Sequence, residues 1–343
     1  MAPSGGCGAI RSRTGSSGER SASFRWLMGQ ICPSGKNVGG IERRQGAGGA
    51  AGRGTWSGIV CAMIPSHGTG VPEIPGTTIS PDGTTIAWFR RGAGPPIVLV
   101  HGATADHTAW RTAGPLLAAN HAIYAIDRRG RGASGDTLPY AIAREYEDVA
   151  AVVDAVAGQT GAPVDVVGHS YGGRIGLGTA LLTPNLRRLV VYEGAPAPAQ
   201  RPFQWPGIMA LLEGLAARDD REGLLSAFMT RVVGMTPAEL AGFRASPTWP
   251  LRVTAAPTII REMQAESSTD AGLERYGGVR IPVLQLVGGD SPAVFTEGTR
   301  ALDQILPDSR VVVLPGQKHA AHHTDPARFV AEIRRFLEAD AGT

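Results

Sequence analysis

The chain of 343 residues is long enough for an α/β domain with an insertion, and its 43% hydrophobic residues can fill a core. The net charge of +3 combines +6 on residues 1–62 with −3 on the remainder, so the larger part carries no basic stripe that would indicate a nucleic-acid partner. No run reaches about 18 apolar residues, so the sequence predicts no membrane-spanning helix and no membrane partner.

Residues 1–62 are rich in Gly, Ser, Ala and Arg and show no helical or strand periodicity, which predicts a disordered N-terminal extension. The segment lacks the apolar core of a signal peptide, and Met63 is the preferred start of the protein. All three cysteines, Cys7, Cys32 and Cys61, lie in it. The rest of the chain therefore has no disulfide framework, which suits a cytoplasmic protein.

From residue 77 to residue 192, strand patterns alternate with helical patterns. Such alternation predicts a parallel sheet covered by helices on both faces. In chain order the sequence predicts a hairpin over 77–90, a strand over 96–100, a helix over 110–118, a strand over 122–126, a helix over 144–157, and strands over 164–167 and 189–192.

Between residues 193 and 281 the alternation stops, and no strand-like run occurs. This stretch predicts a helical insertion with short helices over 211–217, 223–233, 237–243 and 258–265. The sheet pattern then resumes with a strand over 282–287, a helix over 296–306, a strand over 310–314 and a closing helix over 326–339.

The strand over 164–167 ends in Gly168-His169-Ser170-Tyr171-Gly172, and a helix-compatible segment follows. Gly-x-Ser-x-Gly between a strand and a helix is typical of a nucleophile elbow. The glycines leave room where the strand and helix nearly touch, and Ser170 stands at the N-terminus of the helix. The free N–H groups of that terminus favour a developing oxyanion.

A serine hydroxyl becomes a good nucleophile when a base takes its proton and an acid orients that base. After a nucleophile elbow, the expected order of these residues along the chain is Ser, acid, His. The sequence predicts His319, which follows the strand over 310–314 at loop distance, as the base. Asp290, just past the strand over 282–287, is the preferred acid. Glu193, at the end of the sixth strand, is the alternative, with a pocket role if it is not the acid.

These features resemble the cap-bearing serine hydrolases of the α/β-hydrolase superfamily, the esterase- and lipase-like group. The resemblance covers residues 79–337. It rests on His101-Gly102 after a strand, the loop over 127–134, the elbow, Gly289-Asp290, and His319 shortly before Pro326.

The resemblance implies a mostly parallel eight-stranded sheet covered by helices, with a helical cap inserted after strand 6. The core would comprise residues 63–195 and 280–343, and the cap residues 196–279. It also implies a Ser170–Asp290–His319 triad and an oxyanion hole formed by the backbone N–H groups of Ala103 and Tyr171.

Other polar and aromatic residues have two interpretations each. Ser134 could line the pocket or stabilise a turn. Trp205 and Trp249 of the cap could roof the pocket or fill the cap's own core. Four arginines could meet an acidic substrate or form ion pairs: Arg128, Arg129, Arg131 and Arg174.

The predicted function is a serine hydrolase that cleaves a carboxylic ester, or a related small-molecule acyl substrate, through an acyl-enzyme intermediate. No cofactor is implied. A metal site at His319, His322 and His323 is disfavoured because no carboxylate or thiolate spacing completes it. A non-catalytic α/β-hydrolase that binds a small ligand stays open, as do peptidase and cofactor-free haloperoxidase (perhydrolase) chemistry by the same triad. The sequence does not indicate an oligomeric state.

Overall fold

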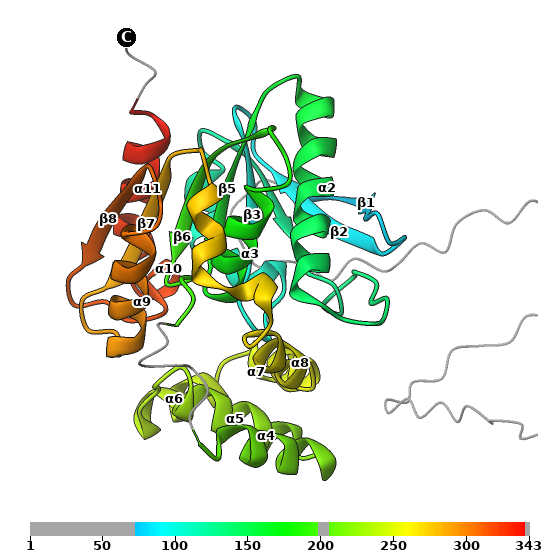
Figure 1. Cartoon of the computed structure of the whole chain (residues 1–343), viewed down its shortest axis with the longest axis vertical. Coiled ribbons are helices and arrows are strands. Elements are labelled where there is room, and N and C mark those ends of the chain that lie inside the picture. The colour runs from blue at the N-terminus through cyan, green and yellow to red at the C-terminus, as the bar shows by residue number, and fades with distance from the viewer. Residues whose placement is uncertain (1–72, 198–205, 340–343) are drawn as a thin grey trace, which may run out of the picture. The chain divides into compact units, whose positions relative to one another are not determined.

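The computed structural model describes residues 73–197 and 206–339 (Figure 1). The chain divides into two units, residues 1–65 and 66–343, and every described residue belongs to the second. The predicted extension over 1–62 and the predicted pocket residue Trp205 lie outside the described residues. The exact boundaries between core and cap stay predictions.

One eight-stranded sheet forms the centre of this unit, in the order β1-β2-β4-β3-β5-β6-β7-β8. The pairs β1–β2 and β2–β4 are antiparallel, and the other five are parallel, which confirms the predicted sheet. The strands are β1 (Ile74–Ile79), β2 (Thr85–Arg91), β3 (Pro96–Val100), β4 (Ala122–Ile126), β5 (Val164–His169), β6 (Leu186–Tyr192), β7 (Val283–Gly288) and β8 (Ser309–Leu314).

Helices cover both faces of the sheet, as the alternating pattern predicts. Residues of β3 alternate between the two resulting cores, with Val98 and Val100 in one and Ile97 and Leu99 in the other. The first core is closed by α2 (Ile142–Thr160), α3 (Tyr171–Thr179) and α9 (Ala293–Asp303), and the second by α1 (Ala113–Leu117) and α11 (Pro326–Leu337). Two short elements complete this part, the 3₁₀ helix η1 (His107–Trp110) and α10 (Ala321–Thr324).

The α-helices that lie between β6 and β7 in the chain gather at one end of the sheet and are called the cap below (Figure 1). They are α4 (Ile208–Ala217), α5 (Arg221–Arg231), α6 (Pro237–Arg244), α7 (Trp249–Ala255) and α8 (Thr258–Ala265). Two 3₁₀ helices follow them in the chain, η2 (Thr269–Ala271) and η3 (Leu273–Gly278), and Ala271 and Tyr276 of these helices pack in the first core. The sequence missed α7, because Pro250 looks like a breaker there. In the structure Pro250 lies in the first helical turn, where proline is tolerated.

Ion pairs fasten α8 to the sheet-bearing part of the chain. Glu262 accepts from Arg128 at 2.5 Å and also from Arg131, while Glu266 pairs with Arg174. Arg261, on the same helix, pairs with Asp136 at 2.8 Å. Breaking one partner of such a buried pair leaves an uncompensated charge, so α8 is held in one position relative to the elbow.

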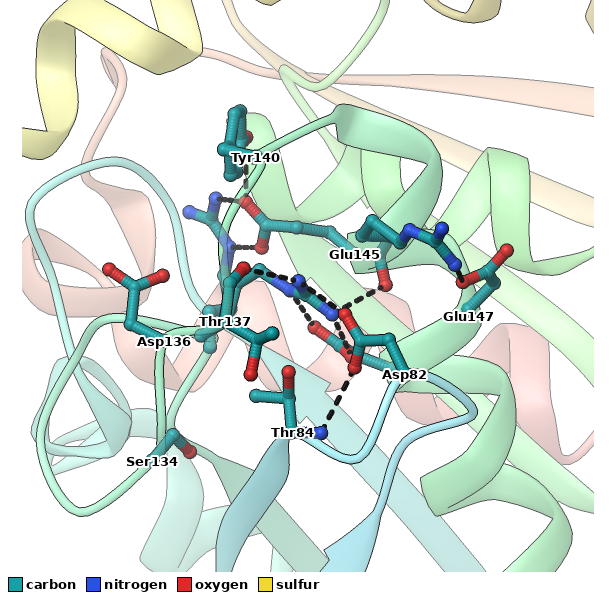
Figure 2. A network of polar contacts seen from close by, with 12 residues as sticks. Asp82, Thr84, Ser134, Asp136, Thr137, Tyr140, Glu145 and Glu147 are labelled. Atoms are coloured by element: carbon teal, nitrogen blue, oxygen red, sulfur yellow. Dashed lines mark hydrogen bonds and ion pairs between the residues drawn. The ribbon is translucent and has the colours of Figure 1, made fainter.

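Arg128 and Arg129 also pair with further acidic side chains of the protein itself. Arg128 donates to Glu145 through two nitrogens at 2.7 and 2.6 Å, and Tyr140 donates to the same carboxylate at 2.8 Å (Figure 2). Arg129 pairs with Asp148 at 2.7 Å and with Asp82 at 3.0 Å. Of the two interpretations of these arginines, the structure supports the ion pairs.

The described residues contain no helix that is both long and apolar enough to cross a membrane.

The elbow brings two glycines into backbone contact, as the motif predicts. A Cβ atom on Gly168 would lie 2.4 Å from the carbonyl oxygen of Gly172. A Cβ atom on Gly172 would lie 2.3 Å from the carbonyl oxygen of Val100. Both neighbours are backbone atoms, one in α3 and one at the end of β3, so neither can move aside cheaply.

Replacing Gly172 by alanine is therefore expected to destabilise the protein by about 3 kcal/mol, at the upper end of the cost of overpacking. Gly158 of α2 is the matched control, because nothing lies within 4 Å of a Cβ atom there. The Gly158→Ala change should stabilise by about 0.5–1 kcal/mol, as alanine does in an open helix position. Urea unfolding of both variants measures this, and equal stabilities would contradict the close approach.

Candidate active site

Ser170 lies at the junction of β5 and α3 in a strained backbone conformation. Its φ of 54° and ψ of −125° are sparsely populated for a residue with a side chain. The turn is held by its N–H group, which donates to the carbonyl oxygen of Tyr192 at 2.8 Å. Tyr171 begins α3, and the first N–H groups of a helix have no acceptor within the helix.

His319 lies in the loop after β8, and three contacts position it. The Nε2–H group of His169 donates to the carbonyl oxygen of His319 at 2.8 Å. The hydroxyl of Tyr192 donates to the neighbouring carbonyl oxygen of Lys318. The imidazole of His319 stacks on Phe295, with ring centroids 4.5 Å apart.

The Nδ1 atom of His319 lies 2.6 Å from Oε2 of Glu193, at the end of β6. The other carboxylate oxygen, Oε1, accepts from the N–H group of Gly288 at 2.7 Å and from the hydroxyl of Ser291 at 2.5 Å. The side chain of Glu193 is fully buried, so these three donors replace its hydration. The carboxylate is thereby oriented at one end by β7 and meets the imidazole at the other.

Glu193, the alternative acid, occupies this place, and no contact between His319 and the side chain of Asp290, the preferred acid, occurs among the described residues. Asp290 is exposed, and its backbone N–H group donates to the carbonyl oxygen of Gln317 at 3.0 Å. Glu193 has a φ of 47°, which turns the chain directly after β6 and brings its side chain against β7.

The other histidines differ from His319 in their surroundings. His101 is fully buried, and burial holds its pKa well below the usual range. Its Nδ1–H group donates to the carbonyl oxygen of Gly102 at 2.8 Å, and its Nε2 accepts from the N–H group of Arg128 at 3.1 Å. Burial likewise keeps the pKa of His169 and of His322 well below the usual range. His101 and His169 therefore have the contacts of buried structural residues.

Within the described ranges, no group of three or more His, Cys, Asp or Glu side chains could hold a metal ion.

Two cavities meet at Ser170 and His319, and both are also lined by Ala103 and by Phe228 of the cap. The α8-side cavity, of about 50 Å³, is further lined by Tyr171, Glu193, Arg174, Glu262, Met263 and Glu266. The α7-side cavity, of about 200 Å³, is further lined by Arg111, Met229, Phe243, Thr248, Arg252 and His323. A substrate carbonyl at Ser170 would thus have room for a group on each side.

Two predicted pocket residues lie elsewhere. Ser134 accepts from the N–H group of Ala87 at 2.8 Å and donates to the carbonyl oxygen of Asp127 at 2.5 Å, so it stabilises the turn. Trp249 is buried in the cap's own core, with its ring edge-on to Phe243 at 5.3 Å. Phe228, on α5, is the cap aromatic that lines both cavities. A sequence pattern does not reveal which face of a short cap helix turns inward.

The model of the Alpha/beta hydrolase family matches residues 97–332, and the chain belongs to this family. A crystal structure of an alpha/beta hydrolase from Sphaerobacter thermophilus is 35% identical, with a TM-score of 0.67, and the match covers 76% of this chain and 100% of that one.

Two further similar proteins have names that state an activity. The esterase RhEst1 from Rhodococcus sp. is 26% identical, with a TM-score of 0.63, over 77% of this chain and 98% of that one. The putative carbamate hydrolase RutD of Caulobacter sp. is 27% identical over 71% of this chain and 91% of that protein.

The position of Trp249 yields a stability prediction. Trp249→Ala should destabilise the protein by about 3 kcal/mol or more, because a buried indole leaves a large cavity. Leu251→Ala, in the same helix, should cost under about 0.5 kcal/mol, since Leu251 is 51% exposed. Thermal and urea unfolding measure the stability of both variants. A Trp249→Ala variant as stable as the Leu251→Ala variant would favour the interpretation that Trp249 lines the pocket.

Proposed function

We propose that the chain is a serine hydrolase that cleaves carboxylic esters or related acyl substrates, with Ser170 as nucleophile, His319 as base and Glu193 as the orienting acid. One observation carries this proposal. The strained serine at the elbow and an imidazole held through Nδ1 by a buried carboxylate line the same two cavities. Esterase and carbamate hydrolase are the activities in the names of the two similar proteins.

The contacts of His319 assign the tautomer that the chemistry needs. Because Nδ1–H donates to Glu193, Nε2 keeps its lone pair and can accept the proton of the Ser170 hydroxyl. The Ser170 oxygen then attacks the carbonyl carbon, and the imidazolium returns the proton to the leaving alcohol. Water, deprotonated by the same nitrogen, hydrolyses the acyl-enzyme and frees Ser170.

The negative charge on the substrate oxygen needs two donors. We assign them to the N–H groups of Tyr171, at the start of α3, and of Ala103, in the loop after β3. Both residues line the α8-side cavity next to Ser170. The cap helices α5, α7 and α8 contribute the other walls and would limit the access of water. Since residues 63–343 hold no cysteine, we also keep the cytoplasm as the proposed location.

A fluorophosphonate probe tests the proposal against the alternative of a non-catalytic binding protein. Ser170 should be labelled, and Ser170→Ala should abolish both labelling and turnover of short p-nitrophenyl esters while the fold persists. Peptide mapping of the labelled chain identifies the modified residue. Label on another residue, or ester turnover in Ser170→Ala at a rate near that of the original chain, would exclude this mechanism.

The acid assignment makes a second prediction. Glu193→Gln should lower kcat by about 10³–10⁴-fold, the cost of replacing the orienting acid of a serine triad by its amide. The glutamine amide has only one oxygen that can accept hydrogen bonds. The change therefore disrupts either the hydrogen bond from His319 or the hydrogen bonds from Gly288 and Ser291. Asp290→Asn, its matched amidation control, should change kcat by less than about threefold because the side chain is exposed.

The measurement is kcat at neutral pH, with circular dichroism at the assay temperature to confirm that both variants are folded. A normal Glu193→Gln variant beside an inactive Asp290→Asn variant would assign the acid to the end of β7.

A further inference from the structure

Two arginines line the α7-side cavity together with Ser170. Arg252 lies on cap helix α7, and Arg111 follows η1 in the core, so the cavity has a cationic residue from each part of the fold. Polar side chains of Ser246, Thr248 and His323 complete this end of the cavity. In the opposite, α8-side cavity the charged side chains have partners within the protein, since Arg174 pairs with Glu266, and Glu262 pairs with Arg128 and Arg131.

Neither arginine of the α7-side cavity has an ion-pair partner among the described residues, in contrast to the buried arginines around α8. Arg252 donates only to uncharged oxygens, the carbonyl of Ala103 at 3.1 Å and the hydroxyl of Thr104 at 3.4 Å. Asp106 is the acidic residue whose charge acts on Arg252, and its Oδ1 already accepts from the backbone and hydroxyl of Thr108.

The electrostatic consequences are visible in neighbouring groups. Burial, opposed by the charge of Asp106 and assisted by the charge of Arg111, lowers the pKa of Arg252 to about 10. Burial, with the charges of Arg111 and Arg252, lowers the pKa of His323 to about 3. At neutral pH His323 is therefore uncharged and Arg252 remains cationic, and no described acidic side chain lines the cavity.

We propose that Arg252 and Arg111 bind a carboxylate group of the substrate, so that the enzyme acts on anionic esters such as half-esters of dicarboxylic acids or esters of hydroxy acids. This rests on the proposed function, because the ester carbonyl must lie at Ser170 while the carboxylate lies at the arginine end of the same cavity. A guanidinium presents paired donors that match the two oxygens of a carboxylate. Arg252 also touches the loop that carries Ala103, so carboxylate binding would occur next to the proposed oxyanion hole.

Two matched pairs of substrates test the proposal and show which side of the ester carries the charge. Monomethyl glutarate against methyl pentanoate places the carboxylate on the acyl side. Carboxymethyl butanoate against propyl butanoate places it on the alcohol side. Hydrolysis is followed by titration at constant neutral pH, and the quantity compared is the ratio of kcat/KM for the anionic and neutral members of a pair.

The anionic ester should be preferred in at least one pair. Arg252→Gln should lower that ratio about 10- to 100-fold, the range expected for a lost hydrogen bond between charged groups. Arg111→Gln should lower it less, because Arg111 is exposed and its charge is screened by solvent. Using the ratio removes any general loss caused by the contact between Arg252 and Ala103. Arg310→Gln, the same charge change on an exposed residue of β8, should leave the ratio unaltered.

An unchanged ratio in both Arg252→Gln and Arg111→Gln, with neutral esters still cleaved through Ser170, would overturn the carboxylate site alone. Absence of both ester turnover and fluorophosphonate labelling would overturn the proposed function instead. In that case the binding of glutarate, measured by calorimetry, still tests whether the carboxylate site exists. Glutarate should bind the Ser170→Ala variant and bind the Ser170→Ala, Arg252→Gln double variant at least about tenfold more weakly. Equal binding to both would refute the site.

Discussion

The buried carboxylate of Glu193 joins the three pieces of chain on which the candidate site depends. It leaves the end of β6, accepts two hydrogen bonds from the end of β7, and meets the imidazole that follows β8. A buried carboxylate without these donors would lose its hydration without compensation, and without the carboxylate the imidazole would lose its orientation. Sheet order makes this possible, because β6, β7 and β8 are adjacent and parallel.

A second set of charges, the ion pairs of α8, places the cap over the elbow. Glu262 pairs with Arg128 of the loop after β4, and Glu266 pairs with Arg174 of α3. The elbow serine and the cap are therefore positioned by the same region of the core. Two cavities lie at Ser170, a small one whose Arg174 and Glu266 pair with each other and a larger one whose Arg111 and Arg252 have no ion-pair partner in the described part of the chain. The proposed chemistry depends on the hydrogen bonds of Glu193, and the proposed choice of substrate depends on the two arginines of the larger cavity.

Much of this could be predicted from local pattern. The elbow was recognisable because Gly168 and Gly172 are required wherever a strand and helix approach so closely, and the structure shows that contact. His319 was recognisable because it follows a strand in the right chain order. Asp290 was a reasonable acid for the same reason, yet both it and Glu193 follow parallel strands at the same edge of the sheet. Nothing local distinguishes them, since the choice depends on the positive φ at Glu193 and on the tertiary contact of its side chain with His319.

The sequence by itself determined the alternation of strands and helices, the position of the helical insertion, and the residue types at the elbow and after the strands. These follow from periodicity and steric demand over a few neighbouring residues. Only the tertiary structure decided which carboxylate meets His319, that Trp249 fills the cap while Phe228 lines the cavities, and that Arg111 and Arg252 face one space. Those outcomes join residues that are far apart in the chain, and they depend on how the cap docks and on which side each loop turns.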